Sequence, residues 1–234
     1  MSLKKFFLRS KITYKIYLYY NIYIRHKAFQ KRNQYSQWGE DKQILNFFKN
    51  KKKGKYIDLG CFHPLMYSNT CLLYKKGWMG MNIDMNPTSI DLFNILRPKD
   101  INICSAISNE KKRVKMFYDD PFSPLNTIDK YFYSKTKETF FKEKKIIDVK
   151  TSKINNFVYK IGNEVDFLNI DIEGLDYRIL KDINFSKLKV KLIAVETHFT
   201  DGKKLKDCDK IYSYLKENKF YIYRRVGPTT LFQN

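Results

Sequence analysis

The 234-residue chain has a formal net charge of +21, and 43% of its residues are hydrophobic. This length suits one α/β domain of ordinary size, and the 18 Phe and 18 Tyr residues indicate a packed core rather than a disordered chain. The charge alone would suggest a polyanionic partner, but nucleic acid is disfavoured because Lys carries the excess, only eight Arg are present, and the basic residues are spread over most of the chain.

Residues 1–34 read as a basic, aromatic extension. Residues 1–32 contain nine Lys or Arg, no acidic residue and interleaved Phe and Tyr. The apolar run from Ile12 to Ile24 is interrupted by Lys15 and Asn21, so it is too short and too polar to span a bilayer, and no signal-peptide cleavage site follows it. Two interpretations stay open with equal weight: residues 1–30 lie on an anionic membrane surface, or they form an ordinary helix packed on the domain.

Residues 35–234 alternate between predicted strands and helices, which indicates an α/β fold with a mostly parallel sheet and helices on both faces. The expected strands are Lys55–Leu59, Trp78–Ile83, Ile101–Ile107, Val165–Ile170, Leu192–Val195 and Phe220–Tyr223. The expected helices are Ser68–Lys76, Ser89–Leu96 with Thr88 as N-cap, Leu175–Leu180 and Asp209–Lys216. Residues 109–156 break this rhythm, apart from a candidate strand at Val114–Tyr118. We interpret them as an insertion that shapes a substrate pocket.

The four cysteines show neither the paired spacing of a metal site nor a disulfide framework; they are Cys61, Cys71, Cys104 and Cys208. They predict free thiols in a reducing compartment, and hence a cytoplasmic protein. The N-terminal extension leaves open a second possibility, in which the protein associates with the inner surface of a membrane.

Two acidic residues end successive predicted strands. Asp58 precedes Gly60, whose lack of a side chain lets the backbone approach a ligand, and Asp84 can accept hydrogen bonds from both hydroxyls of a ribose. The turn continues with Cys61 to Pro64 instead of the glycine-rich loop that binds a pyrophosphate. The pattern therefore favours a nucleoside cofactor without phosphates over NAD or FAD.

Longer blocks, in order and spacing, resemble the FkbM-type methyltransferases. They are Tyr35–Asp41, Tyr56–Pro64, Ser68–Thr70, Lys76–Trp78, Asn82–Pro87, Arg97–Asn102, Ala106–Ser108 and Val165–Gly174. The resemblance implies a Rossmann-like class I methyltransferase fold, S-adenosylmethionine as methyl donor, and transfer to a hydroxyl, often on a sugar of a glycan or a glycosylated metabolite.

On this resemblance, and on the general plan of the fold, a donor site follows. Asp58, Gly60 and Phe62 would line the methionine side, and Cys61 would also contact the cofactor. Asp84 would hold the ribose, Met85 would flank the adenine, and Ser105 and Ala106 would lie near the adenine ring. Asn69 and Thr70 either contact the cofactor or, with Ser68, only cap the helix that follows.

Methyl transfer to an alcohol needs an aligned acceptor oxygen and a base for its proton. Asp171 and Glu173 end the fourth predicted strand, and Glu196 and His198 end the fifth, so these two pairs are the candidate catalytic residues. Three routes to a base stay open: burial raises a carboxylate pKa, His198 takes the proton, or a divalent metal on Asp171, Glu173 and His198 acidifies the acceptor. His63 is either a further substrate contact or a structural histidine beside Pro64.

The sequence thus predicts an O-methyltransferase for a sugar hydroxyl. Two alternatives remain: an RNA methyltransferase, suggested by the net charge and aromatic content, and a membrane-surface protein that keeps the fold without turnover.

Overall fold

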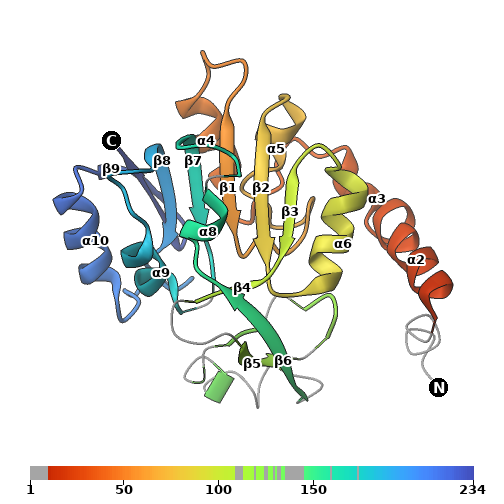
Figure 1. The fold of residues 1–234 in the computed structure, drawn as a ribbon. Helices are drawn as coiled ribbons and strands as arrows, with labels where there is room; N and C mark the ends of the chain where they lie inside the picture. The colour runs from red at the N-terminus through yellow and green to blue at the C-terminus, as the bar shows by residue number, and fades with distance from the viewer. Residues whose placement is uncertain are drawn as a thin grey trace.

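The computed structural model describes residues 10–108, 113–118, 120–123, 126–128, 130, 133–134, 145–158, 160–172 and 174–234. A seven-stranded sheet forms the centre, in the order β3-β2-β1-β7-β8-β10-β9 (Figure 1). The strands are β1 (Lys55–Leu59), β2 (Met79–Asp84), β3 (Ile101–Cys104), β7 (Glu164–Ile170), β8 (Lys189–Glu196), β9 (Tyr221–Val226) and β10 (Thr229–Gln233). Neighbouring strands from β3 to β8 are parallel, whereas β10 is antiparallel to both β8 and β9. The predicted α/β fold, consistent with a Rossmann-like methyltransferase, is confirmed.

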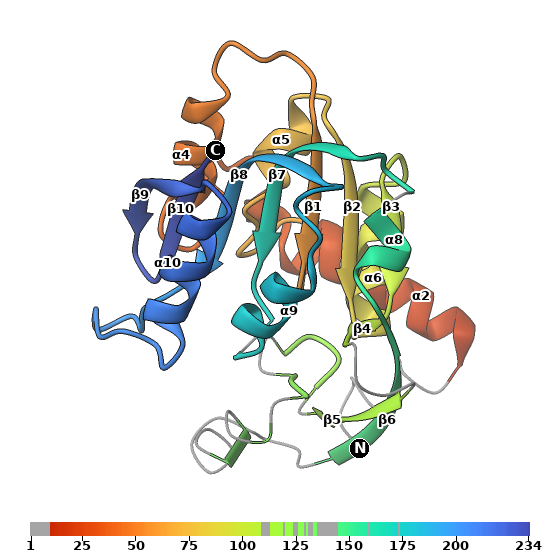
Figure 2. The same ribbon diagram turned by 60° about the vertical axis from the view of Figure 1, so that its left-hand side comes forward.

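Helices cover both faces of the sheet (Figures 1 and 2). They are α4 (Glu40–Phe47), α5 (Cys71–Lys75), α6 (Pro87–Leu96), α8 (Asn155–Val158), α9 (Asp176–Asp182) and α10 (Cys208–Glu217). Successive strand residues point to opposite faces: Ile57 and Leu168 pack in the cluster that includes α9 and α10, and their neighbours Tyr56 and Phe167 pack in the one that includes α4 and α5. The sheet is therefore buried on both sides, as its apolar strands require.

A second sheet of three strands lies beyond the carboxyl ends of the central strands (Figure 2). It contains β4 (Ala106–Ile107), β6 (Lys145–Ser152) and β5 (Arg113–Tyr118), in that order. The prediction of one strand over Ile101–Ile107 is wrong, because the backbone of Ser105 donates to the Asp84 carbonyl (2.9 Å) and the chain then leaves β3 to pair Ala106 with Thr151. The candidate strand Val114–Tyr118 is present as β5, whereas β6 and β10 were not predicted.

Two helix starts also differ from the prediction. The helix expected from Ser68 begins only at Cys71, because the side chains before it bond across the fold instead of capping it. Helix α6 begins at Pro87, and its N-cap is Asn86 rather than Thr88: the Asn86 side chain accepts from the Thr88 backbone N–H (3.1 Å). Pro87 suits the first helical position because its fixed φ is already helical and no donor is lost there.

The N-terminal helices pack along the outside of α6 and comprise α2 (Lys11–Tyr20), the π-helix η1 (Asn21–Arg25) and α3 (Lys27–Gln30) (Figure 1). Leu18 and Ile22 form a buried cluster with Leu92 of α6. The Tyr14 hydroxyl donates to the Asp91 carboxylate (2.7 Å). Within the described residues, no helix is both long and apolar enough to cross a membrane.

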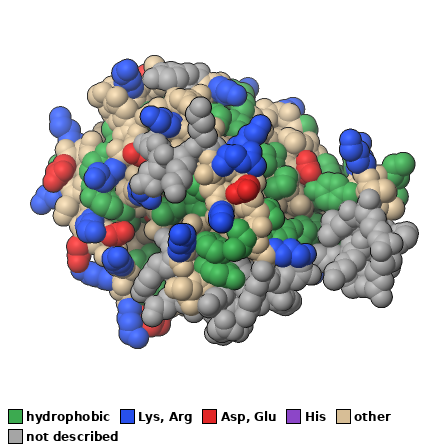
Figure 3. Space-filling view, turned by 60° about the horizontal axis from the view of Figure 1, so that its bottom comes forward, with side chains coloured by type: hydrophobic (Ala, Val, Ile, Leu, Met, Phe, Trp, Pro, Cys, Tyr) green, Lys and Arg blue, Asp and Glu red, His purple; other side chains and the backbone are tan. Residues whose placement is uncertain are grey.

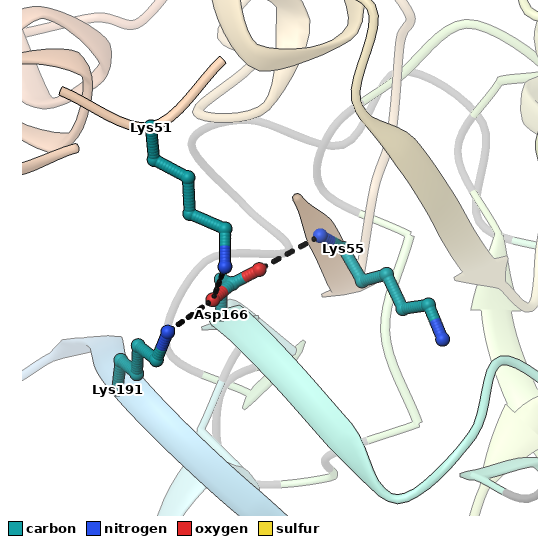
Figure 4. Close-up of polar contacts among 4 residues, drawn as sticks. All are labelled: Lys51, Lys55, Asp166 and Lys191. Carbon is teal, nitrogen blue, oxygen red and sulfur yellow. Dashed lines mark hydrogen bonds and ion pairs between the residues drawn. The ribbon is translucent and has the colours of Figure 1, made fainter. Parts of the chain in front are cut away.

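Asp166, near the start of β7, joins three segments at the amino edge of the sheet (Figure 4). Its carboxylate accepts from Lys51 Nζ (2.6 Å), from the Lys55 backbone N–H of β1 (3.1 Å) and from Lys191 Nζ of β8 (3.0 Å). Burial alone would raise the pKa of Asp166, but these three donors outweigh it and lower the pKa. The ionised carboxylate therefore holds β1, β7 and β8 together at the edge opposite the site described next.

Candidate active site

A cleft lies at the carboxyl ends of β1, β2, β7 and β8. It is lined by eleven of the residues proposed from the sequence: Asp58, Gly60, Cys61, Phe62, Asn69, Asp84, Met85, Ser105, Ala106, Asp171 and Glu196. The described part of the 109–156 segment adds Ser123, Asn126 and Ile128 to the wall. Residues more than a hundred positions apart in the chain thus meet where parallel sheets bind ligands.

Gly60 allows β1 and β7 to close against each other at the floor of the cleft. Its φ is +76°, and a Cβ placed on it would lie 1.7 Å from the carbonyl oxygen of Asp171. One backbone hydrogen bond crosses this junction, from the Asp171 N–H to the Leu59 carbonyl (3.0 Å), and Gly60 itself donates to the Ile83 carbonyl of β2 on the other side (2.9 Å). No residue with a side chain fits here without moving the backbone of Asp171.

Asp84 ends β2 with its carboxylate half-buried at the cleft. One oxygen accepts from the Phe62 backbone N–H (2.9 Å) and the other from the Asn86 backbone N–H (2.7 Å). Burial raises the pKa of Asp84 to about 6, against the effect of these two donors. Because a carboxylate can accept about four hydrogen bonds, Asp84 keeps the capacity to bind a pair of ligand hydroxyls.

Asp58 lies deeper, and neighbouring side chains occupy both of its oxygens. Thr70 Oγ1 donates to one (2.6 Å), and Asn169 Nδ2 donates to the other (2.9 Å). Asn69 in turn donates to Asn169 Oδ1 (2.9 Å). Asp58 therefore fixes the floor of the cleft, and Thr70 lies beneath the cleft instead of lining it.

Arg97, whose role sequence reasoning missed, anchors the loop between β1 and α5. It is 1% exposed, and its guanidinium donates to Thr70 Oγ1 (2.8 Å), to Ser68 Oγ (2.9 Å) and to the Pro64 carbonyl. Since the Thr70 hydroxyl donates its own hydrogen bond to Asp58, Thr70 links this buried cation to the floor of the cleft. Two features of the sequence could have indicated this role: Arg97 begins a block that resembles the family, and it is one of only eight arginines in the chain.

Phe62 and Tyr67 shape the same loop from the cleft side. Both have a left-handed backbone, with φ of 47° and 53°, which is uncommon for residues with a side chain. Their rings stack with centroids 6.2 Å apart. Such backbone conformations persist where the surroundings enforce them, and they often lie at binding sites.

Asp171 and Glu196 follow β7 and β8, which are adjacent strands, and both line the cleft. Burial, and then repulsion from Glu196, raise the pKa of Asp171 well above its ordinary value. A carboxylate tuned in this way is a stronger base than a free one. Of the other two catalytic candidates, Glu173 lies outside the described residues.

His198 is not among the cleft-lining residues. It is buried after β8, with its Nδ1 2.8 Å from Thr197 Oγ1, and burial lowers its pKa. Among the described residues, no group of three His, Cys, Asp or Glu side chains could hold a metal ion. Because Glu173 belongs to the predicted metal set, a metal at this site stays a prediction.

His63 does not line the cleft either, so the structure does not support its predicted substrate contact. Its Nδ1 accepts from the backbone N–H groups of Leu65 (3.0 Å) and Met66 (3.1 Å). Burial, with His26 and Arg97 nearby, lowers the pKa of His63 to about 3, so its ring is neutral. His63 thus braces the loop after Gly60, beside a small cavity that Asn21 and His26 also line.

The chemistry of the lining indicates which cofactor fits. Although the chain contains 45 Lys and Arg, none is among the described residues that line the cleft, whereas Asp58, Asp84, Asp171 and Glu196 are. Pyrophosphate would meet uncompensated carboxylates there, whereas a cationic sulfonium nucleoside would be favoured. S-adenosylmethionine therefore fits the residues present, with Asp84 placed for its ribose and Met85, Ser105 and Ala106 on the side expected for its adenine.

Strand order, acidic cleft and glycine turn together define a methyltransferase of the class I architecture. The methyltransferase FkbM domain matches residues 39–222, which is more than half of the chain. The chain therefore belongs to the FkbM methyltransferase family and is an S-adenosylmethionine-dependent methyltransferase. A comparison with curated proteins gave no match.

Proposed function

We propose that the protein transfers a methyl group to a hydroxyl of a sugar, in a glycan or a glycosylated metabolite of the cytoplasm. The observation that carries the proposal is the cleft itself, which combines a carboxylate of raised pKa, Asp171, with neutral hydrogen-bonding side chains and no basic residue among those described. A sugar hydroxyl needs a base, and a neutral sugar needs hydrogen-bond donors and acceptors instead of cations.

When bound, S-adenosylmethionine supplies an electrophilic methyl group on a positively charged sulfur. Asp84 would hold the ribose hydroxyls of the donor, and Asn69 would bind polar atoms of the donor at the floor of the cleft. Asp171 and Glu196, at the ends of β7 and β8, would face the acceptor. The Asp171 carboxylate would accept the proton of the acceptor hydroxyl as the oxygen bonds to the methyl carbon and the carbon–sulfur bond breaks, so that the donor leaves as the neutral thioether. Glu196 would help to keep the pKa of Asp171 high. Ser123 and Asn126, which line the cleft from the 109–156 segment, would contact the acceptor.

An RNA acceptor is the less favoured alternative. Polyanion recognition uses Lys and Arg beside the bound strand, and on the face at the carboxyl edge these residues are scattered among hydrophobic and neutral surface in the part that is described (Figure 3). The acidic side chains of the cleft would also repel a phosphate backbone.

The test uses purified protein, donor with a labelled methyl group, and a panel of neutral oligosaccharides, glycosylated metabolites and single-stranded RNA. We expect label only in sugars, as a methyl ether identified by NMR. Asp84→Ala should abolish donor binding in calorimetry. Asp171→Asn should retain donor binding but reduce turnover by roughly 10²- to 10⁴-fold, the usual contribution of a general base.

Asp201→Asn, which alters an exposed acid in the loop after β8, is the matched control and should change neither quantity. Label in RNA, or on a nitrogen or sulfur atom, would contradict the proposed acceptor. Full turnover by Asp171→Asn would contradict the assignment of the base.

A further inference from the structure

The outward side of α2 and η1, residues 11–25, carries a second apolar stripe in addition to the one packed on α6. We call these residues the N-terminal arm. Six large hydrophobic side chains on it are solvent-exposed: Ile12 (75%), Ile16 (54%), Tyr19 (46%), Tyr20 (43%), Tyr23 (45%) and Ile24 (66%). Their spacing follows the helix period, so Ile12, Ile16, Tyr19 and Tyr23 lie along one line. An exposed stripe of this kind marks an interaction surface.

The inner side of the arm is fixed, so the outer stripe cannot turn inwards. Leu18 and Ile22 are 3% and 0% exposed against α6, and Tyr17 packs edge-on against Phe122 with ring centroids 5.4 Å apart. The Tyr14 hydroxyl is bonded to Asp91. The outer stripe therefore faces away from the domain while the arm is folded.

The charged side chains of the arm itself are all positive. Lys11 and Lys15 line one shallow surface hollow with Ile12, Ile16 and Tyr19. Arg25 and Lys27, just beyond the end of the stripe, are also exposed. No acidic residue occurs before Glu40 in the sequence. Figure 3 shows hydrophobic and basic side chains next to each other at the right-hand end of the molecule, where the arm lies.

From these observations we infer that the N-terminal arm docks on an anionic lipid bilayer, with the Ile and Tyr stripe in the interface and the basic side chains at the headgroups. Tyrosine suits this depth because its ring is apolar and its hydroxyl stays hydrated. At about 1.5 Å per residue the arm is roughly 20 Å long, too short to cross the hydrocarbon core, so it lies in the plane of the surface.

The charge pattern favours a bilayer over a second copy of this chain. A symmetric contact through the stripe would bring the cations of one arm close to those of the other, and the arm contains no acidic residue to offset the repulsion. A surface of anionic headgroups satisfies the same cations at once.

The test is co-sedimentation of the full chain with vesicles of phosphatidylcholine alone and of phosphatidylcholine mixed with phosphatidylglycerol. We expect binding only to the mixed vesicles, and weaker binding as salt is added. The double variant Ile16→Ser/Tyr19→Ser should lose at least about tenfold in vesicle affinity, because two apolar anchors are removed. Lys11→Gln/Lys15→Gln should lose about fivefold per charge, the effect of one basic residue near an anionic surface.

The matched control is Tyr221→Ser/Ile222→Ser on β9, where side chains of the same types are exposed to 59% and 55% on the far edge of the sheet. This variant should bind vesicles as the unmodified protein does. Circular dichroism and donor affinity should be unchanged in all three variants, which separates loss of docking from loss of folding.

Three results would overturn the inference. One is equal binding to the two kinds of vesicle, and another is full binding by Ile16→Ser/Tyr19→Ser. The third is a dimer in sedimentation that this variant dissociates, without vesicle binding by either protein, since a second copy would then be the occupant of the stripe.

Discussion

Replacing Gly60 with alanine tests whether the junction of β1 and β7 positions the cleft. The left-handed backbone, with φ of +76°, should cost about 1–2 kcal/mol for any side chain. The new Cβ would also lie 1.7 Å from the Asp171 carbonyl oxygen, where about 3.3 Å is needed. The backbone at Gly60 must therefore shift, which disrupts the bond from Gly60 to Ile83 of β2 and the bond from Asp171 to Leu59, at about 1 kcal/mol each.

The expected loss of unfolding free energy is thus about 3–4 kcal/mol, a large share of the roughly 5–15 kcal/mol that stabilises a protein. Gly77→Ala is the matched control, because φ there is +86° but no atom lies within 4 Å of the added Cβ. It should lose only the backbone share, about 1–2 kcal/mol.

Urea unfolding followed by circular dichroism measures both values, and Tm should differ between the variants by about 4–8 °C. Donor affinity should fall in Gly60→Ala and stay unchanged in Gly77→Ala, since only the first moves backbone that lines the cleft. Equal destabilisation by the two substitutions would refute the argument.

Four further results are expected. Arg97→Met should lower the unfolding free energy by about 3 kcal/mol, because three buried acceptors lose a charged donor, and urea unfolding would show it; a loss below about 1 kcal/mol would contradict this role. Donor affinity should fall as the pH drops through about 6, where Asp84 becomes protonated, and Asp84→Asn should flatten that dependence in calorimetry. Glu196→Gln should move the rising limb of the pH–rate profile to lower pH, since it removes a charge that raises the pKa of Asp171; an unshifted limb would exclude this coupling. Asp166 has a lowered pKa in the folded protein, so its contribution to stability is complete above the pKa of the unfolded chain and is lost as the pH falls through the folded value. Asp166→Asn should therefore lower the unfolding free energy at pH 7 by about 2 kcal/mol and make it less sensitive to acid below about pH 4. Urea unfolding at several pH values measures both effects.

The position of Asp58, Gly60 and Asp84 in the cleft could be predicted because these residues lie in or directly after short, recognisable strands. An acid and a glycine after one strand, and an acid after the next, meet at one edge of any parallel sheet, so Asp58, Gly60 and Asp84 needed only the strand assignments. The same logic placed Asp171 and Glu196 at neighbouring strand ends.

Side-chain bonds between distant segments could not be predicted from local patterns. Thr70 was expected to cap a helix or contact the cofactor, but Asp58 and Arg97 engage its hydroxyl. His63 follows the glycine turn as a ligand contact would, yet its ring accepts bonds from the two backbone N–H groups after Pro64. For Thr70, partners 12 and 27 positions away decided the role. For His63, backbone groups two and three residues further on decided it, a local bond that competes with ligand contact.

The strands β6 and β10 were missed for a related reason. Residues of β6 are mostly exposed and lack the apolar run of a buried strand. The last predicted strand ended at Tyr223, so the prediction missed β10 (Thr229–Gln233), which follows β9 after only two residues. Among the described residues, the small sheet over the cleft is thus a product of pairing rather than of strong local preference.

The opposite edges of the central sheet have separate tasks. At the amino edge, the Asp166 carboxylate pairs with Lys51 and Lys191 and joins neighbouring strands. The cleft lies at the carboxyl edge, where Ser123, Asn126 and Ile128 line it from a segment outside the central sheet. On the proposed function, substitutions in that segment would change which acceptor is bound, while the ion-paired edge would continue to hold the scaffold. A library randomised at these three positions is accordingly a direct route to enzymes with new acceptors, and it samples the variation by which relatives of this architecture would diverge.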